Sequence, residues 1–134
     1  MKKYKKTDGK IIIPYGVYPE RHELRAASIL AAYYGTVEFI RAKNIFKHKN
    51  PDIKMGGIIW EIKVPIGKSK RTIENNYRVA QQQSENVIFD IRNIGIGENQ
   101  AIAQIKREAS IRRARKLRRI KIITKSSKIL DIDC

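Results

Sequence analysis

The most constraining feature of this sequence is a Gly56-Gly57 pair between two runs of strand-forming residues. Two adjacent glycines accept the positive φ angles of a two-residue primed turn. Residues 52–55 and 58–64 are therefore predicted to form a β-hairpin, which Pro65 closes.

The register of this hairpin predicts which side chains meet. With the two glycines as the loop, Ile53 lies opposite Trp60, and Asp52 lies opposite Glu61. Opposite residues point to the same face, with Cβ atoms about 5 Å apart. Because side chains alternate along a strand, Lys63 shares the face of Glu61, and the apolar residues suit a core on the other face.

This pattern places two carboxylates and an amine together. Like charges on opposite strands are destabilising unless something neutralises them. A divalent cation does so, and oxygen ligands suit Mg²⁺ or Mn²⁺ better than zinc. A metal at Asp52 and Glu61 would polarise a phosphoryl oxygen, and Lys63 would orient the attacking water or stabilise the transition state. In the alternative reading, both acids are solvated and pair with Lys63 and Lys54.

The charge of the chain narrows its partners. The 134 residues carry 29 Lys and Arg against 13 Asp and Glu, a net charge of +16. Such a surface favours a polyanion, nucleic acid before an anionic membrane or an acidic protein. A single cysteine, Cys134, excludes an internal disulfide. We expect no membrane span and no secretory signal, since the basic residues 1–6 precede no apolar run.

The remaining elements predict the fold. Strands are expected at 10–13, 36–40, 86–91, 119–124 and 128–132, and helices at 19–34, 71–84 and 98–118. The order β-α-β-β-β-α-β-α-β-β indicates an α/β chain of the mixed α+β type, with a central mixed β-sheet flanked by helices. We expect a flexible basic N-terminus at 1–9 and a single domain at 10–134, monomeric when free.

The motif Pro51-Asp52-x8-Glu61-x-Lys63 resembles the PD-(D/E)xK signature of the restriction-endonuclease-like nucleases. The order of the predicted elements also matches the core of that superfamily. The resemblance implies catalytic roles for Asp52, Glu61 and Lys63. Glu23 matches the additional glutamate that many members bring from the first core helix, so Glu23, Asp52 and Glu61 are expected to bind Mg²⁺, with Mn²⁺ as the alternative.

A longer stretch is similar to the tRNA-cleaving C-terminal domains of contact-dependent growth inhibition toxins of the CdiA type. The matching residues are Trp60, Glu61, Lys63, Pro65, Gly67, Ser69, Thr72, Asn75, Gln83, Ser84, Asn86, Asp90 and Arg92. This resemblance implies a small metal-dependent ribonuclease that acts on tRNA in the cytoplasm of a target cell. It also implies a cognate immunity protein that blocks the site.

Further residues are expected to contact nucleic acid. Thr72, Asn76 and Gln83 keep one helical register, and a basic helix over 106–119 should grip phosphates, so that affinity falls with salt. Stacking surfaces for unpaired bases are expected from five tyrosines, Tyr15, Tyr18, Tyr33, Tyr34 and Tyr77, although helical spacing puts at least one of Tyr33 and Tyr34 in the core. The expected contacts are Lys68, Lys70, Arg71, Thr72, Asn76, Gln83, Arg112, Arg113, Arg115 and Lys116. Asp90, inside an apolar strand, should pair with Arg92 or a lysine.

Three other functions remain open from the sequence. A DNA endonuclease or resolvase of the same fold would share every catalytic residue. A non-catalytic basic RNA-binding protein would show salt-dependent binding without cleavage. An interaction module would present its basic face to an acidic protein. His22 and His48, with no companion motif, are weak evidence for a metal-free ribonuclease.

Overall fold

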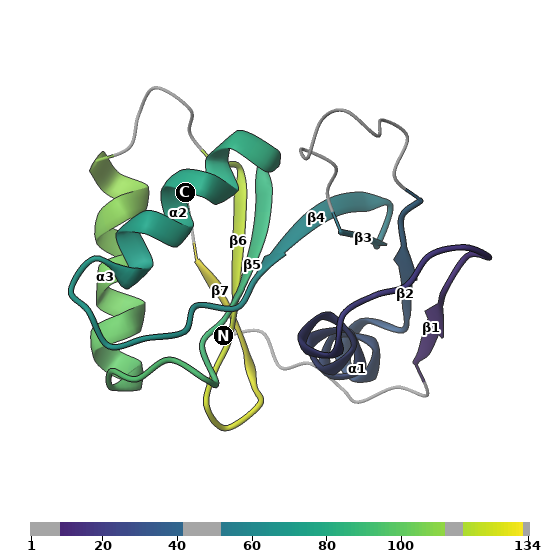
Figure 1. Cartoon of the computed structure of the whole chain (residues 1–134), viewed down its shortest axis with the longest axis horizontal. Coiled ribbons are helices and arrows are strands. Elements are labelled where there is room, and N and C mark those ends of the chain that lie inside the picture. Colours follow the sequence, from purple (N-terminus) through teal and green to yellow (C-terminus); the bar gives the residue numbers. More distant parts are fainter. Residues whose placement is uncertain (1–8, 42–51, 112–116, 133–134) are drawn as a thin grey trace.

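The computed structural model describes residues 9–41, 52–111 and 117–132. Within these residues, seven strands form one sheet and three helices pack on it (Figure 1). The elements are β1 (Lys10–Ile12), α1 (Arg21–Tyr34), β2 (Thr36–Phe39), β3 (Ile53–Met55), β4 (Ile58–Lys63), α2 (Thr72–Gln83), β5 (Asn86–Asp90), α3 (Glu98–Ile111), β6 (Arg119–Ile123) and β7 (Ile129–Ile132). No described helix is long and apolar enough to span a bilayer.

The strands follow one another across the sheet in chain order. β1 and β2 are parallel, β2, β3 and β4 pair antiparallel, β4, β5 and β6 are parallel, and β7 returns antiparallel. The predicted element order and the mixed sheet flanked by helices are therefore confirmed.

The predicted hairpin is confirmed at its turn and along its strands. Gly56 and Gly57 have φ angles of 61° and 75°, which residues with a Cβ atom rarely adopt. The pairs Ile53–Trp60 and Met55–Ile58 have the predicted register. The turn therefore fixes which residues of β4 point to each face of the sheet.

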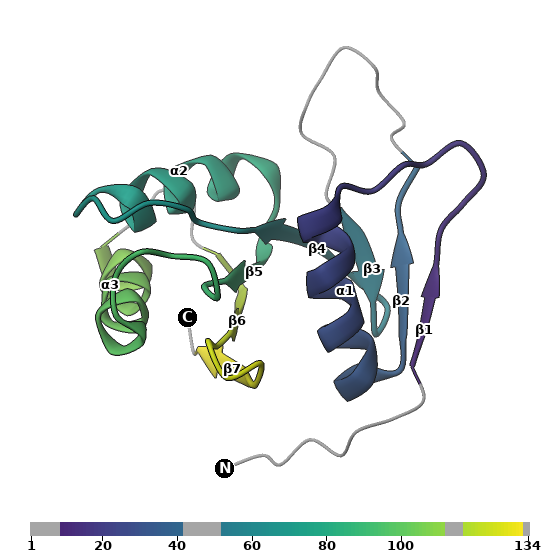
Figure 2. The ribbon, with the colours of Figure 1, turned by 60° about the horizontal axis from the view of Figure 1, so that its bottom comes forward.

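The two faces of the sheet carry different helices (Figure 2). α1 packs its buried stripe, Ala26, Ala27, Leu30 and Ala31, against one face over β2, β3 and β4. α2 and α3 cover the other face over β5 and β6. Along β5 the alternation is visible, since Ile88 joins the α1 side and its neighbours Val87 and Phe89 join the α2 side.

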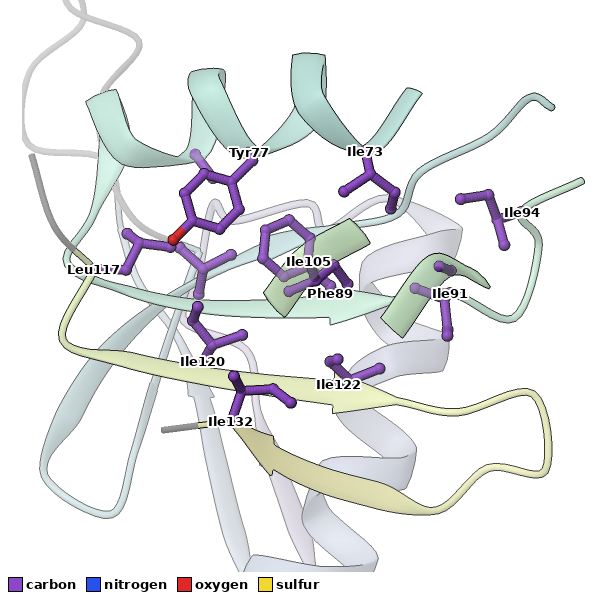
Figure 3. Close-up of a cluster of buried hydrophobic side chains, with 13 residues drawn as sticks. Ile73, Tyr77, Phe89, Ile91, Ile94, Ile105, Leu117, Ile120, Ile122 and Ile132 are labelled. Carbon is purple, nitrogen blue, oxygen red and sulfur yellow. The ribbon is translucent and has the colours of Figure 1, made fainter. Parts of the chain in front are cut away.

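The core under α2 and α3 is closely packed (Figure 3). The rings of Tyr77 and Phe89 stack with centroids 5.8 Å apart and planes 13° apart. Tyr77 is only 1% exposed, so the prediction that its ring stacks on bases is wrong. Ile105 of α3 and Ile120 and Ile122 of β6 complete the contact. This packing anchors α2 next to β4, the strand that carries the motif.

The third helix is shorter than the sequence predicts. We expected helix over 98–118, but α3 ends at Ile111 and Arg118 is not helical. Leu117 is 1% exposed, and the N–H groups of Arg118 and Arg119 both donate to the carbonyl of Glu85, at 2.7 and 3.3 Å. Burial of Leu117 and these hydrogen bonds direct the chain into β6, so the expected basic helix over 106–119 is wrong at its end.

The predicted partner of Asp90 is confirmed as Arg92. The Asp90 side chain is almost fully buried, and its two oxygens accept hydrogen bonds from Nε and Nη2 of Arg92 at 2.8 and 2.7 Å. Such a bidentate pair satisfies a charge that would otherwise be costly to bury.

Replacing Arg92 should therefore destabilise the fold. We expect Arg92→Ala to lower the free energy of unfolding by about 3 kcal/mol, since it leaves the Asp90 carboxylate buried and unpaired. Urea denaturation followed by circular dichroism measures the change. The control is Arg78→Ala, which removes a more exposed arginine paired with Glu74. Equal losses in the two variants would contradict the importance of the buried pair.

Candidate active site

β4 places Glu61 and Lys63 on the sheet face that α2 covers. Trp60 and Ile62 pack on the α1 side. Because side chains alternate along a strand, Glu61 and Lys63 point to the opposite face. Glu61 is only 3% exposed, and its Oε2 lies 3.3 Å from Nζ of Lys63. The predicted sharing of one face by Glu61 and Lys63 is thus realised as a buried ion pair.

Asp52 lies directly before β3, where the hairpin ladder ends. Its N–H donates to the carbonyl of Trp60 at 3.0 Å, and its Oδ2 accepts from the N–H of Ile62 at 2.8 Å. A backbone donor on β4 therefore holds the carboxyl group in place. The carboxyl groups of Asp52 and Glu61 are near neighbours, since each shifts the pKa of the other.

Glu23 reaches the same place from the first turn of α1. Its Oε1 accepts a hydrogen bond from the N–H of Glu20 at 2.8 Å, in a capping box that fixes the start of the helix. Glu23 also lies close enough to Asp52 to raise the pKa of the Asp52 carboxyl. The structure therefore brings together the predicted set Glu23, Asp52, Glu61 and Lys63.

Burial sets the protonation of the two central acids. Desolvation, followed by the charge of Glu61, raises the pKa of Asp52 from 3.8 to about 8. Desolvation also raises the pKa of Glu61, from 4.5 to about 7, although the nearby Lys63 opposes the rise. Near neutral pH the pair therefore retains protons that exposed carboxyl groups would have lost.

A metal ion needs several ligating side chains around one point, which the described residues would have to supply. Among them, no three or more His, Cys, Asp or Glu side chains are arranged to hold an ion as they stand. However, Oε1 of Glu61 is buried and accepts no hydrogen bond from a described residue. This orphaned oxygen beside a second carboxyl group fits an oxygen-liganded cation such as Mg²⁺.

The predicted nucleic-acid contacts are spread along α2 and the segment before it. Lys68, Lys70 and Arg71 are exposed between β4 and α2, a few residues after Lys63. Thr72 begins α2 and is 9% exposed, and its side chain is therefore mostly withdrawn from solvent.

The three predicted contact residues of α2, Thr72, Asn76 and Gln83, do not lie at one place on the helix. Asn76 donates to the carbonyl of Thr72 at 2.8 Å, so these two residues are together. Gln83 ends α2, about 16 Å farther along the helix axis than Thr72. Arg112, Arg113, Arg115 and Lys116 lie outside the described residues.

The two histidines and one backbone group complete the comparison with the sequence. His22 lies 3.4 Å from Glu20, and His48 lies outside the described residues. Sequence reasoning did not identify the backbone N–H of Ile62 as the group that orients Asp52. A backbone donor has no residue-specific signal, so only the strand register could have indicated it.

The raised pKa values predict how stability depends on pH. Between about pH 4 and 8 the unfolded chain loses protons from Asp52 and Glu61 that the folded chain retains. The free energy of unfolding should therefore fall as pH rises through this range. Asp52→Asn removes one of these acids and should melt a few degrees higher than the wild type at pH 8, with little difference at pH 4.

Thermal melts at both pH values test this expectation. Asp131→Asn is a matched control, because Asp131 is a half-exposed acid paired with Lys121 at 2.6 Å. A wild-type protein whose melting temperature rises steadily from pH 4 to pH 8 would contradict the buried, protonated pair.

Comparisons with known proteins agree with this fold. A model of the family described as "Contact-dependent growth inhibition CdiA C-terminal domain" matches residues 49–129, more than half of the chain. A search of the curated proteins finds no match.

Among solved structures, the chain is similar to one described as "CdiA-CT/CdiI toxin and immunity complex from Burkholderia pseudomallei". The TM-score is 0.61 at 18% sequence identity, and the match covers 95% of this chain and 98% of that one. This likeness confirms the mixed α+β fold, while the family model extends over the motif-bearing hairpin from Asp52 to Lys63. The chain belongs to the family of contact-dependent growth inhibition CdiA C-terminal domains.

Proposed function

We propose that this chain is a metal-dependent endonuclease of the PD-(D/E)xK class, and that it cleaves tRNA as a toxin domain. The observation that carries the proposal is the cluster formed by Glu23, Asp52, Glu61 and Lys63, three acids and one lysine drawn from three elements. A buried, charge-rich cluster costs stability, and such clusters are typical of catalytic sites.

The acids are the metal ligands in this proposal. Asp52 and Glu61, assisted by Glu23, would hold Mg²⁺, with Mn²⁺ as the alternative. When bound, the cation would polarise a phosphoryl oxygen and lower the pKa of a bound water. The backbone N–H of Ile62 keeps Asp52 oriented, and the capping box keeps Glu23 in place.

Lys63 is the proposed positioning and charge-stabilising group. Its Nζ lies 3.3 Å from Oε2 of Glu61. From there the ammonium group can orient the attacking water and stabilise the negative charge that grows on the phosphorus oxygens in the transition state.

Charge and family support an RNA substrate. Net charge of +16 favours a phosphate backbone, and the exposed Lys68, Lys70 and Arg71 follow the catalytic strand. The family is that of CdiA C-terminal domains, and the similar solved structure is described as a toxin with its immunity protein. We therefore propose tRNA as substrate, the cytoplasm of a target cell as the place of action, and a cognate immunity protein as partner.

Cleavage of total tRNA is the direct test. The wild type with Mg²⁺ should fragment tRNA, and EDTA should abolish the reaction. Asp52→Asn and Glu61→Gln, which keep side-chain size, should each lower the rate by about 100-fold or more, because they remove a charged ligand. Lys63→Met should lower kcat while RNA binding persists. Gel analysis of a time course measures all four proteins.

The control for this test is Arg78→Ala, a surface change on α2 away from the cluster. Cleavage of duplex DNA but not tRNA would favour the DNA endonuclease of the same fold. Salt-dependent binding with intact RNA in Mg²⁺ would favour the non-catalytic RNA-binding protein. Undiminished cleavage by Asp52→Asn would falsify the assigned ligands.

Cation binding can be tested without any substrate. Mg²⁺ should raise the melting temperature of the wild type at pH 8, where less proton competition remains, and less so at pH 5. The shift should disappear in Asp52→Asn and persist in Asp131→Asn. A shift of equal size at both pH values, or in both variants, would place the ion elsewhere.

A further inference from the structure

Two tyrosine rings stand almost free of the protein beside α1. Tyr15 is 93% exposed and Tyr18 is 89% exposed, in the segment between β1 and α1. Large aromatic side chains are normally buried for most of their surface. Among the described residues, neither ring stacks on another ring. The two rings therefore contribute little to the stability of the fold.

The segment that carries the rings is nevertheless held in place. The N–H of Val17 donates to the carbonyl of Pro14 at 3.0 Å, and Gly16 has a φ of 83°. This is the arrangement of a type II turn, with Tyr15 at its outer corner. Val17 packs against the core on the α1 side and anchors the segment between the two tyrosines.

The backbone of Tyr18 lies near the residues that cap α1. Glu20, two residues after Tyr18, donates its N–H to Oε1 of Glu23 at 2.8 Å. Two residues span at most about 7 Å of extended chain. The backbone of Tyr18 is therefore within about 7 Å of Glu20, whose N–H binds the Glu23 carboxyl.

A cationic group accompanies the rings. The Nη1 atom of Arg41 lies so close to the turn that a Cβ added to Gly16 would be 3.5 Å from it. Arg41 is exposed, and within the described ranges no acid pairs with it. Aromatic faces beside a free guanidinium match a single nucleic-acid strand, whose bases stack and whose phosphates are negative.

We propose that Tyr15 and Tyr18 stack on unpaired bases of the substrate strand, and that Arg41 contacts its phosphates. The bases of a duplex are already stacked on their neighbours, so these rings would direct the enzyme to single-stranded or splayed-out segments of RNA. The inference rests on the proposed nuclease function, because it assigns the substrate contact of that same site.

Binding in EDTA tests this without cleavage. Fluorescence anisotropy compares a labelled single-stranded RNA with a duplex of the same sequence. The double variant Tyr15→Ala/Tyr18→Ala should bind the single strand at least about 10-fold more weakly and bind the duplex as the wild type does. Tyr15→Phe/Tyr18→Phe keeps the rings and should bind normally. Ile111→Ala, an exposed apolar residue of α3, is the matched control.

Several results would overturn the inference. The first is a double alanine variant that binds the single strand as tightly as the wild type. The second is an equal loss of affinity for the single strand and the duplex. The third is a wild type that does not bind the single strand. Loss of immunity-protein binding with unchanged RNA binding would assign the rings to a protein interface instead. A wild type that binds RNA through the rings but leaves tRNA intact in Mg²⁺ would refute the nuclease and retain the stacking contact.

Discussion

The repulsion between the buried carboxyl group of Glu61 and the partly buried one of Asp52 is the constraint on which the candidate site depends. Asp52 and Glu61 are brought into contact by the β3–β4 hairpin and withdrawn from water by the surrounding elements. Lys63, the N–H of Ile62 and retained protons offset this repulsion in part. A protein selected for stability alone would place apolar side chains here, so the arrangement is better explained by chemistry at this position.

Helix α1 can supply Glu23 to the cluster because of the position of Asp52. Glu61 and Lys63 face α2, whereas α1 packs on the opposite face of the sheet. Asp52 precedes β3 and lies at the strand end, where the first turn of α1 can reach it. Glu23 therefore serves two purposes with one carboxyl group, since one oxygen caps the helix and the group as a whole contacts Asp52.

Local sequence signals predicted most of the fold and the proximity of Glu61 to Asp52 and Lys63. The element order, the turn at Gly56-Gly57 and the register of the hairpin depend on neighbouring residues, so pattern alone was sufficient. The end of α3 depends on the burial of Leu117 against distant strands, which no local pattern contains. The raised pKa values of Asp52 and Glu61 also required coordinates, because desolvation depends on how the whole chain packs.

The basic surface and the acidic cluster are complementary in the proposed reaction. Exposed lysines and arginines draw a phosphate backbone toward the protein, but a phosphate approaching Asp52 and Glu61 meets groups of its own sign. Protons on these two acids reduce that repulsion in the free protein, and a divalent cation would reduce it further while leaving the carboxylates charged. A divalent cation between them would reconcile a surface that attracts polyanions with acids that repel them, and the proposed nuclease function gives this place to Mg²⁺.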